Sequence, residues 1–248
     1  MPVCVECGTA VTNLYTEYSK GNIRLTQCSN CNKFADKYVE HDFVIVFIDM
    51  LLHKPQVYRH LLFNRLEYRD QGLDPSVLKL GVLLVLFDVY IKWFRVEKMK
   101  DDPNDANSDL ALAFMQQPLY YQYVYILTLC AVEFLAYQMS VIFAVKLCMG
   151  SRYAILKYNY ITMTLILSSF GKMLLILMVI WSFHELEYSW LVSIFVFTSN
   201  VEALAVFLCT TYATTSAIAL FGILVKVLVQ VCFLRLTNSP LIISLLSF

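Results

Sequence analysis

The chain has 248 residues, of which 59% are hydrophobic and 15% are charged, and its mean hydropathy is +0.62. A soluble globular domain is typically about 45–50% apolar and about 25% charged. This composition therefore excludes an ordinary soluble domain and indicates a membrane protein. The formal net charge is zero, so bulk electrostatics do not favour binding to nucleic acid or to an anionic surface.

The N-terminal segment, residues 1–42, is polar and contains two pairs of cysteines. Cys4 and Cys7 form the first pair, and Cys28 and Cys31 form the second after an interval of twenty residues. Two Cys-x2-Cys pairs at about this interval predict a zinc site, because each short gap lets a tight turn direct both sulfurs at one ion. Four thiolates leave no coordination position for water, so we expect a structural ion rather than a catalytic one.

The alternative for these four cysteines is a pair of disulfides. The charge distribution described below places the segment in the reducing cytosol, where disulfides are rare. The basic residues Arg24, Lys33 and Lys37 are close enough in sequence to offset the negative charge of a tetrathiolate zinc site, and Gly8 is available to the first turn. We therefore predict a zinc-ribbon-like module. The other cysteines lie in or beside apolar segments and are interpreted as small apolar residues: Cys130, Cys148, Cys209 and Cys232.

Residues 43–70 are expected to form an interfacial segment between this module and the first span. The apolar run at residues 43–52 is too short to cross a bilayer, which needs about 20 helical residues. It is predicted to be a buried strand or a helix lying at the membrane interface. Residues 56–69 have the spacing of an amphipathic helix, and Pro55 suits its first position. This helix either lies in the headgroup layer or packs on the zinc module.

The remainder, residues 77–248, is predicted to be a transmembrane helical domain. Five apolar segments are long enough to span a bilayer, at residues 77–94, 121–145, 159–183, 190–210 and 214–234. Tyrosines and tryptophans lie near their ends, as an interfacial aromatic belt requires. The last two segments form either a tight hairpin or a broken re-entrant pair. We therefore expect an α-helical polytopic membrane protein with four or five spans, and favour five.

Basic residues are distributed unevenly along the chain. Eight of the 19 lysines and arginines precede residue 77. If the N-terminus is cytosolic, the cytosolic side carries eleven basic residues and the opposite side four, which agrees with the positive-inside tendency. We predict a multi-pass protein with a cytosolic N-terminus and a lumenal C-terminus.

Several polar residues are predicted to lie near the middle of the bilayer: Glu133, Lys172, Asn200, Glu202 and Lys226. A charge without a partner at that depth costs about 2.5–3.5 kcal/mol on insertion scales. Pairing between helices would remove much of this cost. The set either connects helices structurally or lines a polar cavity for a lipid headgroup or hydroxyl. Asp88 is off-centre in its span, and Lys79 and Lys92 are close enough to the ends of that span to extend to the interface.

The sequence does not favour an enzyme. None of the four histidines forms a metal-ligand pair at helical spacing, and there is no phosphate-binding glycine loop or G-x-S-x-G motif. His53 and His60 lie near Asp49, where a structural role is more consistent with the sequence than a catalytic base. Aromatic and basic residues in the module are too sparse for a nucleic-acid platform, so we expect no nucleic-acid partner.

The N-terminal motifs resemble the Arv homology domain. They are Cys4-Val5-Glu6-Cys7-Gly8, Tyr18-Ser19-x-Gly21-Asn22-Ile23-Arg24-Leu25, Cys28-x-x-Cys31 and Ala35-Asp36-x-Tyr38-Val39-Glu40. The match continues through Phe47-Ile48-Asp49 and His53-Lys54-Pro55-x-x-Tyr58-Arg59-His60-Leu61-Leu62-Phe63-Asn64. A looser likeness covers the spans, where residues 198–204 (TSNVEAL) are similar to a late-span element of the family.

This resemblance to the Arv family implies a protein of the endoplasmic reticulum membrane, found also at the Golgi. It implies a mediator of sterol and lipid homeostasis, involved in intracellular sterol transport and distribution, sphingolipid metabolism and glycosylphosphatidylinositol (GPI) anchor biosynthesis. The partners it implies are membrane lipids, either a sterol or a GPI-precursor lipid. The alternative is a non-enzymatic scaffold subunit of the first GPI-synthesis glycosyltransferase complex, docked through the zinc module. A catalyst in its own right is the weakest of the three hypotheses.

Overall fold

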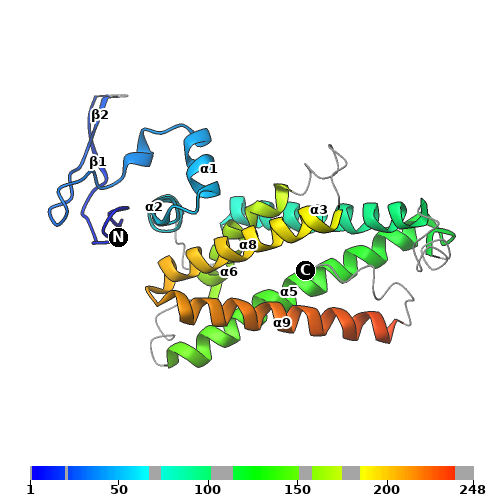
Figure 1. Ribbon diagram of the computed structural model, residues 1–248. Coiled ribbons are helices and arrows are strands. Elements are labelled where there is room, and N and C mark those ends of the chain that lie inside the picture. The colour runs from blue at the N-terminus through cyan, green and yellow to red at the C-terminus, as the bar shows by residue number, and fades with distance from the viewer. Residues whose placement is uncertain are drawn as a thin grey trace.

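The computed structural model describes residues 2–19, 22–66, 74–101, 114–150, 158–174 and 185–237. A small two-stranded module at the N-terminus lies at one end of a bundle of long helices (Figure 1). The elements are β1 (Tyr15–Ser19), β2 (Asn22–Leu25), the 3-10 turn η1 (Lys37–Val39), α1 (Phe43–Leu51), α2 (Pro55–Arg59) and its π-helical continuation η2 (His60–Arg65), α3 (Pro75–Asp101), α5 (Leu119–Met149), α6 (Tyr158–Ser168) and its 3-10 continuation η4 (Ser169–Leu174), α8 (Glu185–Leu208) and α9 (Tyr212–Leu236).

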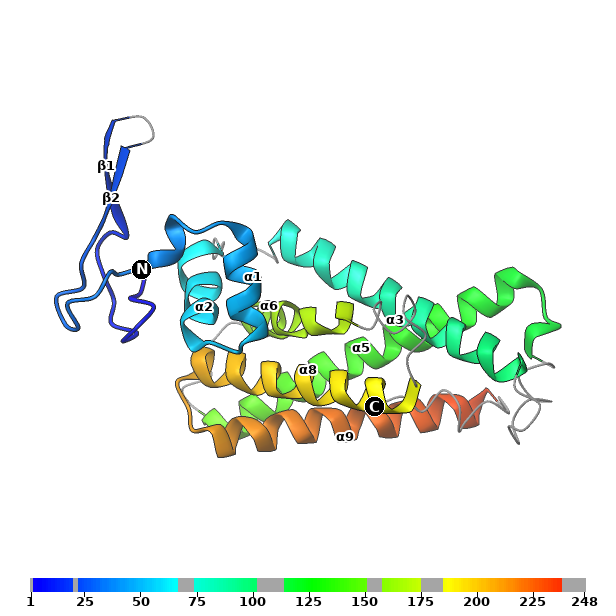
Figure 2. The same cartoon turned by 45° about the horizontal axis from the view of Figure 1, so that its top comes forward.

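The module is built around an antiparallel hairpin. Strands β1 and β2 pair with Glu17 opposite Ile23, and the hairpin projects away from the helices (Figure 2). Isolated bridges close the two cysteine-bearing loops, one between Val3 and Ala10 and the other between Gln27 and Phe34. Both cysteine pairs are therefore held in tight loops at the base of the hairpin.

The apolar run at residues 43–52 forms helix α1, so the strand alternative is wrong. The helix ends in a Schellman cap: the His53 N–H bonds to the Met50 carbonyl and the Lys54 N–H to the Asp49 carbonyl, both at 3.1 Å. His53 has the left-handed φ of 51° that this cap needs. A short apolar run has no period that separates strand from helix, whereas the cap stops a helix and sends the chain directly into α2.

Helix α2 and its continuation η2 pack between the module and the bundle (Figures 1 and 2). Pro55 occupies the start of α2, as predicted. Toward the module, the Arg59 guanidinium donates to the carbonyl oxygens of Val5 and Glu6, at 2.8 and 2.9 Å. Of the two alternatives for the amphipathic helix, the structure shows packing on the module. The helix ends at Arg65, earlier than predicted, because Leu66 is already extended, and residues 67–69 of the predicted range lie outside the described residues.

A buried carboxylate joins the module to this helix. Asp36 is 0% exposed, and its Oδ2 lies 2.7 Å from both His60 Nδ1 and the donating Nδ2 of Asn64, while its Oδ1 accepts from the Tyr38 N–H at 3.0 Å. Asn64 also brackets the backbone of Val3, accepting its N–H at 2.9 Å and donating to its carbonyl at 3.0 Å. The helix is thus bound to both ends of the module.

A second buried acid ties the module to α1. The Tyr38 hydroxyl donates to Asp49 at 2.8 Å, and Lys54 pairs with the other oxygen of Asp49 at 2.7 Å. Burial opposes ionisation of Asp49, but the hydrogen bonds from Lys54 and Tyr38 outweigh it and hold the pKa of Asp49 below its usual value. Burial also raises the pKa of Tyr38 well above its usual range, so the phenol stays a donor.

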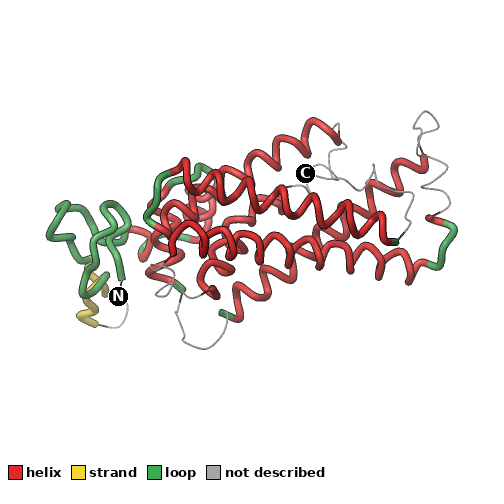
Figure 3. Tube along the Cα trace, turned by 90° about the horizontal axis from the view of Figure 1, so that it is seen from below, coloured by secondary structure: helices red, strands yellow, loops and turns green. Residues whose placement is uncertain are grey.

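The bundle consists of α3, α5, α6, α8 and α9 (Figure 3). Within the described residues, three helical stretches are long and apolar enough to cross a membrane: Leu119–Met149, Trp190–Leu208 and Tyr212–Leu236. They coincide with the second, fourth and fifth predicted spans, and the last two are joined as a tight hairpin. The first predicted span lies within α3, which is long enough but carries several charges. The third is helical from residue 158 to 174, and residues 175–183 lie outside the described residues.

The hydrophobic core of the bundle is continuous with that of the module. One cluster contains Val5 and Tyr38 of the module, Val57 of α2, Val145 of α5 and Leu204 of α8. Helices α5 and α9 approach closely at Gly222, where an added Cβ would lie 2.8 Å from a methyl group of Val141. Small residues permit such close helix contacts in membranes. The module is therefore packed against the helical body rather than tethered to it.

Substituting Asp36→Ala should loosen the module from α2. The change leaves His60 and Asn64 without a shared acceptor, at a cost of about 1–3 kcal/mol for each buried group left unsatisfied. Hydrogen exchange should accelerate at the Val3 and Tyr38 amides, and the apparent melting temperature in detergent should fall. Asp42→Ala is the matched control, because Asp42 is exposed and makes no side-chain cap. Equal behaviour of the two variants would contradict this role.

Candidate metal centre and intramembrane cavity

The four predicted cysteine ligands converge at one point. Their sulfur atoms all lie within 4.8 Å of one another, with Cys4 Sγ 3.8 Å from Cys31 Sγ and Cys7 Sγ 3.7 Å from Cys28 Sγ. In a tetrahedral site with Zn–S bonds of about 2.3 Å, the sulfurs are separated by about 3.8 Å. All four cysteines are free thiols, so the geometry fits one metal ion and not two disulfides.

The two cysteine loops have the same local structure. In each, the residue after the second cysteine has a left-handed φ, 75° at Gly8 and 56° at Asn32. The N–H of that residue bonds to the carbonyl of the first cysteine, Gly8 to Cys4 at 2.8 Å and Asn32 to Cys28 at 2.9 Å. Glycine and asparagine tolerate this conformation best. The expected role of Gly8 in the first turn is confirmed, and Asn32 is its counterpart in the second.

The surroundings of the thiols are polar and basic. Lys33 and Lys37 pair with Glu6 at 3.5 and 3.8 Å, so they balance that side chain as well as any charge on the sulfurs. Burial raises the pKa of Cys4 to about 12, whereas hydrogen bonds with Thr9 lower the pKa of Cys7 to about 6. A bound ion would be held by Cys4, Cys7, Cys28 and Cys31, supplying a closed structural cross-link with no open position for catalysis.

Removal of one ligand should abolish metal binding. We expect the purified full-length chain to contain about one zinc ion and Cys28→Ser to lose it, since three thiolates cannot complete the tetrahedral site. Elemental analysis of dialysed protein measures this directly. Cys148→Ser is the control, because Cys148 is an exposed thiol at the end of α5. Intact zinc in Cys28→Ser would contradict the assignment.

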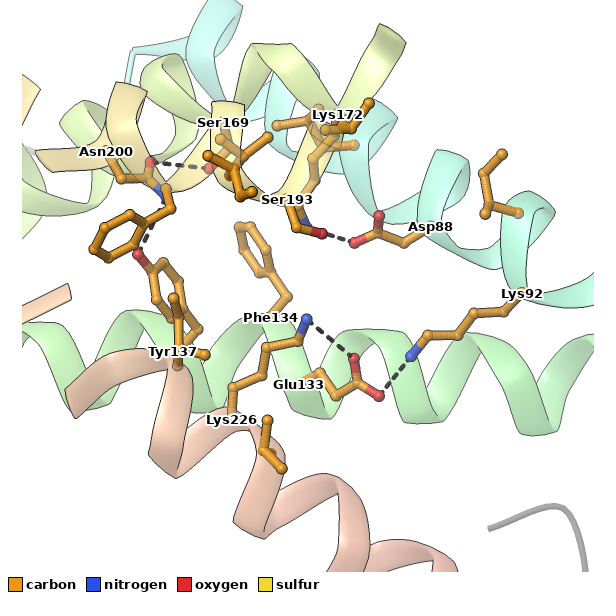
Figure 4. Close-up of a pocket in the computed structure, with 18 of the residues that line it drawn as sticks. Asp88, Lys92, Glu133, Phe134, Tyr137, Ser169, Lys172, Ser193, Asn200 and Lys226 are labelled. Carbon is orange, nitrogen blue, oxygen red and sulfur yellow. Dashed lines mark hydrogen bonds and ion pairs between the residues drawn. The ribbon is translucent and has the colours of Figure 1, made fainter. Parts of the chain in front are cut away.

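A cavity of 290 Å³ lies inside the bundle and is lined by α3, α5, η4, α8 and α9 (Figure 4). Four of the five predicted intramembrane residues line it: Glu133, Lys172, Asn200 and Lys226. Glu202 is not among the lining residues. Its carboxylate instead accepts a hydrogen bond from the Tyr212 hydroxyl at 3.3 Å. The residues that the sequence grouped by depth are thus mostly brought together.

Ion pairs between helices cross this cavity (Figure 4). Lys92 of α3 pairs with Glu133 of α5 at 2.5 Å, and Lys172 of η4 pairs with Asp88 of α3 at 2.7 Å. Lys226 of α9 lies 4.0 Å from the second oxygen of Glu133. The charges both connect helices and line a cavity, so the two interpretations of this set are compatible.

The interface interpretation of Lys92 is wrong. Lys92 is buried and directed at Glu133, because a carboxylate on the adjacent helix provides a nearer partner than the membrane surface. Asp88, considered off-centre in its span, lines the same cavity. Sequence depth alone missed both residues. Their i, i+4 spacing, which places Asp88 and Lys92 on one face of α3, is the sequence signal that could have identified them.

Asn200 organises the polar end of the cavity. Its Oδ1 accepts from the Ser168 hydroxyl at 2.5 Å, and its Nδ2 donates to the Tyr137 hydroxyl at 3.2 Å. These contacts join α5, α6 and α8. A buried asparagine with partners on two other helices is well suited to fix the relative positions of the three.

Two distant sequence motifs meet at the junction of module and bundle. The Tyr58 hydroxyl lies 2.8 Å from Ser199 Oγ, and His53 Nε2 lies 3.2 Å from both Thr198 Oγ1 and the Phe195 carbonyl oxygen. The TSNVEAL segment therefore contacts the HKPxxYRH segment with its first two residues and the cavity with its third, Asn200. His53 thus has a structural partner in α8, and His60 has one in Asp36 of the module.

A charge swap tests the pairing across the cavity. Asp88→Lys and Lys172→Asp should each destabilise the protein by about 1.5–3 kcal/mol, the range for a hydrogen bond to a charged group, and the double variant should recover most of the loss. Detergent-titration unfolding supplies the double-mutant cycle. Lys79→Asp, on the exposed side of α3, serves as control. A double variant no more stable than either single would show that the pair is not coupled.

These features define a mostly helical protein with, in its described part, three helices that could cross a membrane and a four-cysteine module, able to hold a metal ion, packed on one end of its bundle. The model of the Arv1-like family matches residues 3–204, which is most of the chain. The chain therefore belongs to the Arv1-like family. Membership of this family fits a role in lipid or sterol homeostasis.

Relatives in distant eukaryotes share this family. The chain is 44% identical over 231 residues to Protein arv1 homolog of Dictyostelium discoideum, covering 92% of this chain and 93% of that protein. It is 41% identical over 238 residues to Protein arv1 of Schizosaccharomyces pombe, covering 95% and 86%. With Protein ARV1 of Homo sapiens the identity is 33% over 229 residues, covering 90% and 78%. No solved structure matches the chain.

Proposed function

We propose that the protein mediates sterol and lipid homeostasis at the endoplasmic reticulum membrane, and also at the Golgi, through sterol transport and distribution. It also takes part, in this proposal, in sphingolipid metabolism and GPI-anchor biosynthesis. Family membership supports the proposal. The observation that carries it is the charged cavity, which is lined by three helices long and apolar enough to cross a membrane, α5, α8 and α9, together with α3 and η4.

The zinc module supports this role as a rigid end-piece on the cytosolic side. Because α2 contacts both the module and α8, the module fixes the end of the helix that carries Asn200. We further propose that the protein acts without catalysing a reaction. His53 and His60, the two histidines considered as bases, are engaged in structural hydrogen bonds.

Reconstitution of the full-length chain tests the proposed function. Vesicles containing the protein should bind a fluorescent sterol or a phospholipid, or accelerate its transfer to acceptor vesicles, and Lys172→Glu should reduce this several-fold by removing a pair that crosses the cavity. Lys146→Glu should behave as the unmodified chain, because Lys146 is exposed at the end of α5. Protein that neither binds nor transfers any of these lipids would defeat the proposal.

The second candidate is a scaffold subunit of the first GPI-synthesis glycosyltransferase complex. The observation that favours it is the module, whose hairpin projects from the body (Figure 2) and which exposes two aromatic side chains, Tyr18 in β1 at 68% and Phe34 beyond β2 at 52%. Aromatic residues on a protruding surface are typical of protein contacts.

Replacing both aromatic side chains tests this candidate. The double variant Tyr18→Ser/Phe34→Ser should lower recovery of the glycosyltransferase subunits with the chain by at least about fivefold, since aromatic anchors dominate interface energies. Quantitative mass spectrometry of material isolated in mild detergent measures the recovery. Tyr120→Ser, at an exposed tyrosine of α5, controls for lost surface area. Unmodified chain that recovers no such subunit would reject the scaffold role.

A further inference from the structure

The cavity carries more positive than negative charge. Among the described residues that line it, four are basic and two acidic: Lys92, Arg95, Lys172 and Lys226, against Asp88 and Glu133. Two of these lysines form short ion pairs with the two acids. Among the described residues, Lys226 has one ion-pair partner, Glu133 at 4.0 Å, and that carboxylate is already held by Lys92 at 2.5 Å. The ammonium of Lys226 therefore keeps donors available to a ligand.

A buried acceptor completes this picture. The side chain of Gln138 lines the cavity and is 5% exposed, and its Oε1 has no hydrogen-bond partner among the described residues. A buried carbonyl without a donor costs about 1–3 kcal/mol. A ligand that brings a hydroxyl donor would remove that cost. The cavity thus presents a cation and an unsatisfied acceptor, both supplied by helices of the bundle.

The rim of the cavity is apolar and open. Ile194 of α8 and Leu220 of α9 line it and are 58% and 57% exposed. Both lie on helices that are long and apolar enough to cross a membrane. A polar group inside the cavity can therefore be connected, past these side chains, to hydrocarbon chains in the surrounding lipid.

We propose that this cavity binds the phosphodiester headgroup of an anionic, hydroxyl-bearing phospholipid, with Lys226 contacting the phosphate and Gln138 accepting from a headgroup hydroxyl. This proposal rests on the proposed lipid-handling function and names the ligand class of its site. A sterol supplies a hydroxyl but no charge to match Lys226. A choline phospholipid has no net charge and no headgroup hydroxyl.

Photocrosslinking distinguishes these ligands. Full-length protein in vesicles is labelled in parallel with photoreactive phosphatidylinositol, phosphatidylcholine and sterol, and the labelled peptides are mapped. Phosphatidylinositol should label α5, α8 and α9 around the cavity. Lys226→Gln should reduce that labelling at least about tenfold, the effect of losing one charge-assisted hydrogen bond, and Lys226→Arg should restore it.

The variants are chosen so that the protein stays folded. Lys226→Gln leaves the Lys92–Glu133 pair intact, and its melting temperature is measured alongside. Lys146→Gln removes an exposed lysine from α5 and should leave labelling unchanged. Soluble glycerophosphoinositol in excess should compete much more weakly than the lipid. Equal competition would identify a site for a free phosphate ester and overturn the lipid assignment.

The remaining outcomes separate this proposal from the broader function. If sterol labels the cavity and phosphatidylinositol does not, the headgroup proposal fails and lipid handling stands. If Lys226→Gln is labelled as strongly as the unmodified chain, recognition of charge by Lys226 fails. If no lipid labels the protein, both proposals fail.

Discussion

The structure depends on one buried carboxylate, that of Asp36. It lies between the module and helix α2, and it is held by His60, Asn64 and the Tyr38 N–H. A buried carboxylate without such partners would cost several kcal/mol, so the helix and the module stabilise each other. Because Asn64 also holds Val3, beside the first cysteine, the metal site and the helix share the same hydrogen-bond network. The position of the four-cysteine cluster and that of α2 are therefore physically linked.

Helix α2 connects the module to the bundle, so the position of the module also affects that of α8. One side contacts the module through Arg59, and the other contacts α8 through Tyr58 and Ser199. The next residue, Asn200, lies at the cavity and bonds to Ser168 and Tyr137. A continuous series of contacts thus leads from the cysteine loops to the polar end of the cavity. This series gives a structural reason why the four-cysteine module and the helical bundle belong to one protein.

The sequence predicted best where the chemistry is local. The cysteine spacing identified the four sulfurs that converge, because a Cys-x2-Cys turn needs little long-range information. The apolar run of α1 was ambiguous between strand and helix, since the deciding cap depends on His53 adopting a left-handed φ. Lys92 was misplaced because its partner, Glu133, lies 41 residues away on another helix. Pairings between helices depend on packing that no single segment encodes.

The distances along the chain between contacting residues also imply an order of assembly. Contacts within the module and α2 span at most 61 residues, as between Val3 and Asn64, whereas those from α2 to α8 span about 141, as between Tyr58 and Ser199. During synthesis the module and α2 can form early and can then pack on Val145 of α5, but the contact between Tyr58 and Ser199 has to wait until the fourth predicted span has left the ribosome. Until then, the side of α2 that faces α8 in the finished fold lacks its partner helix.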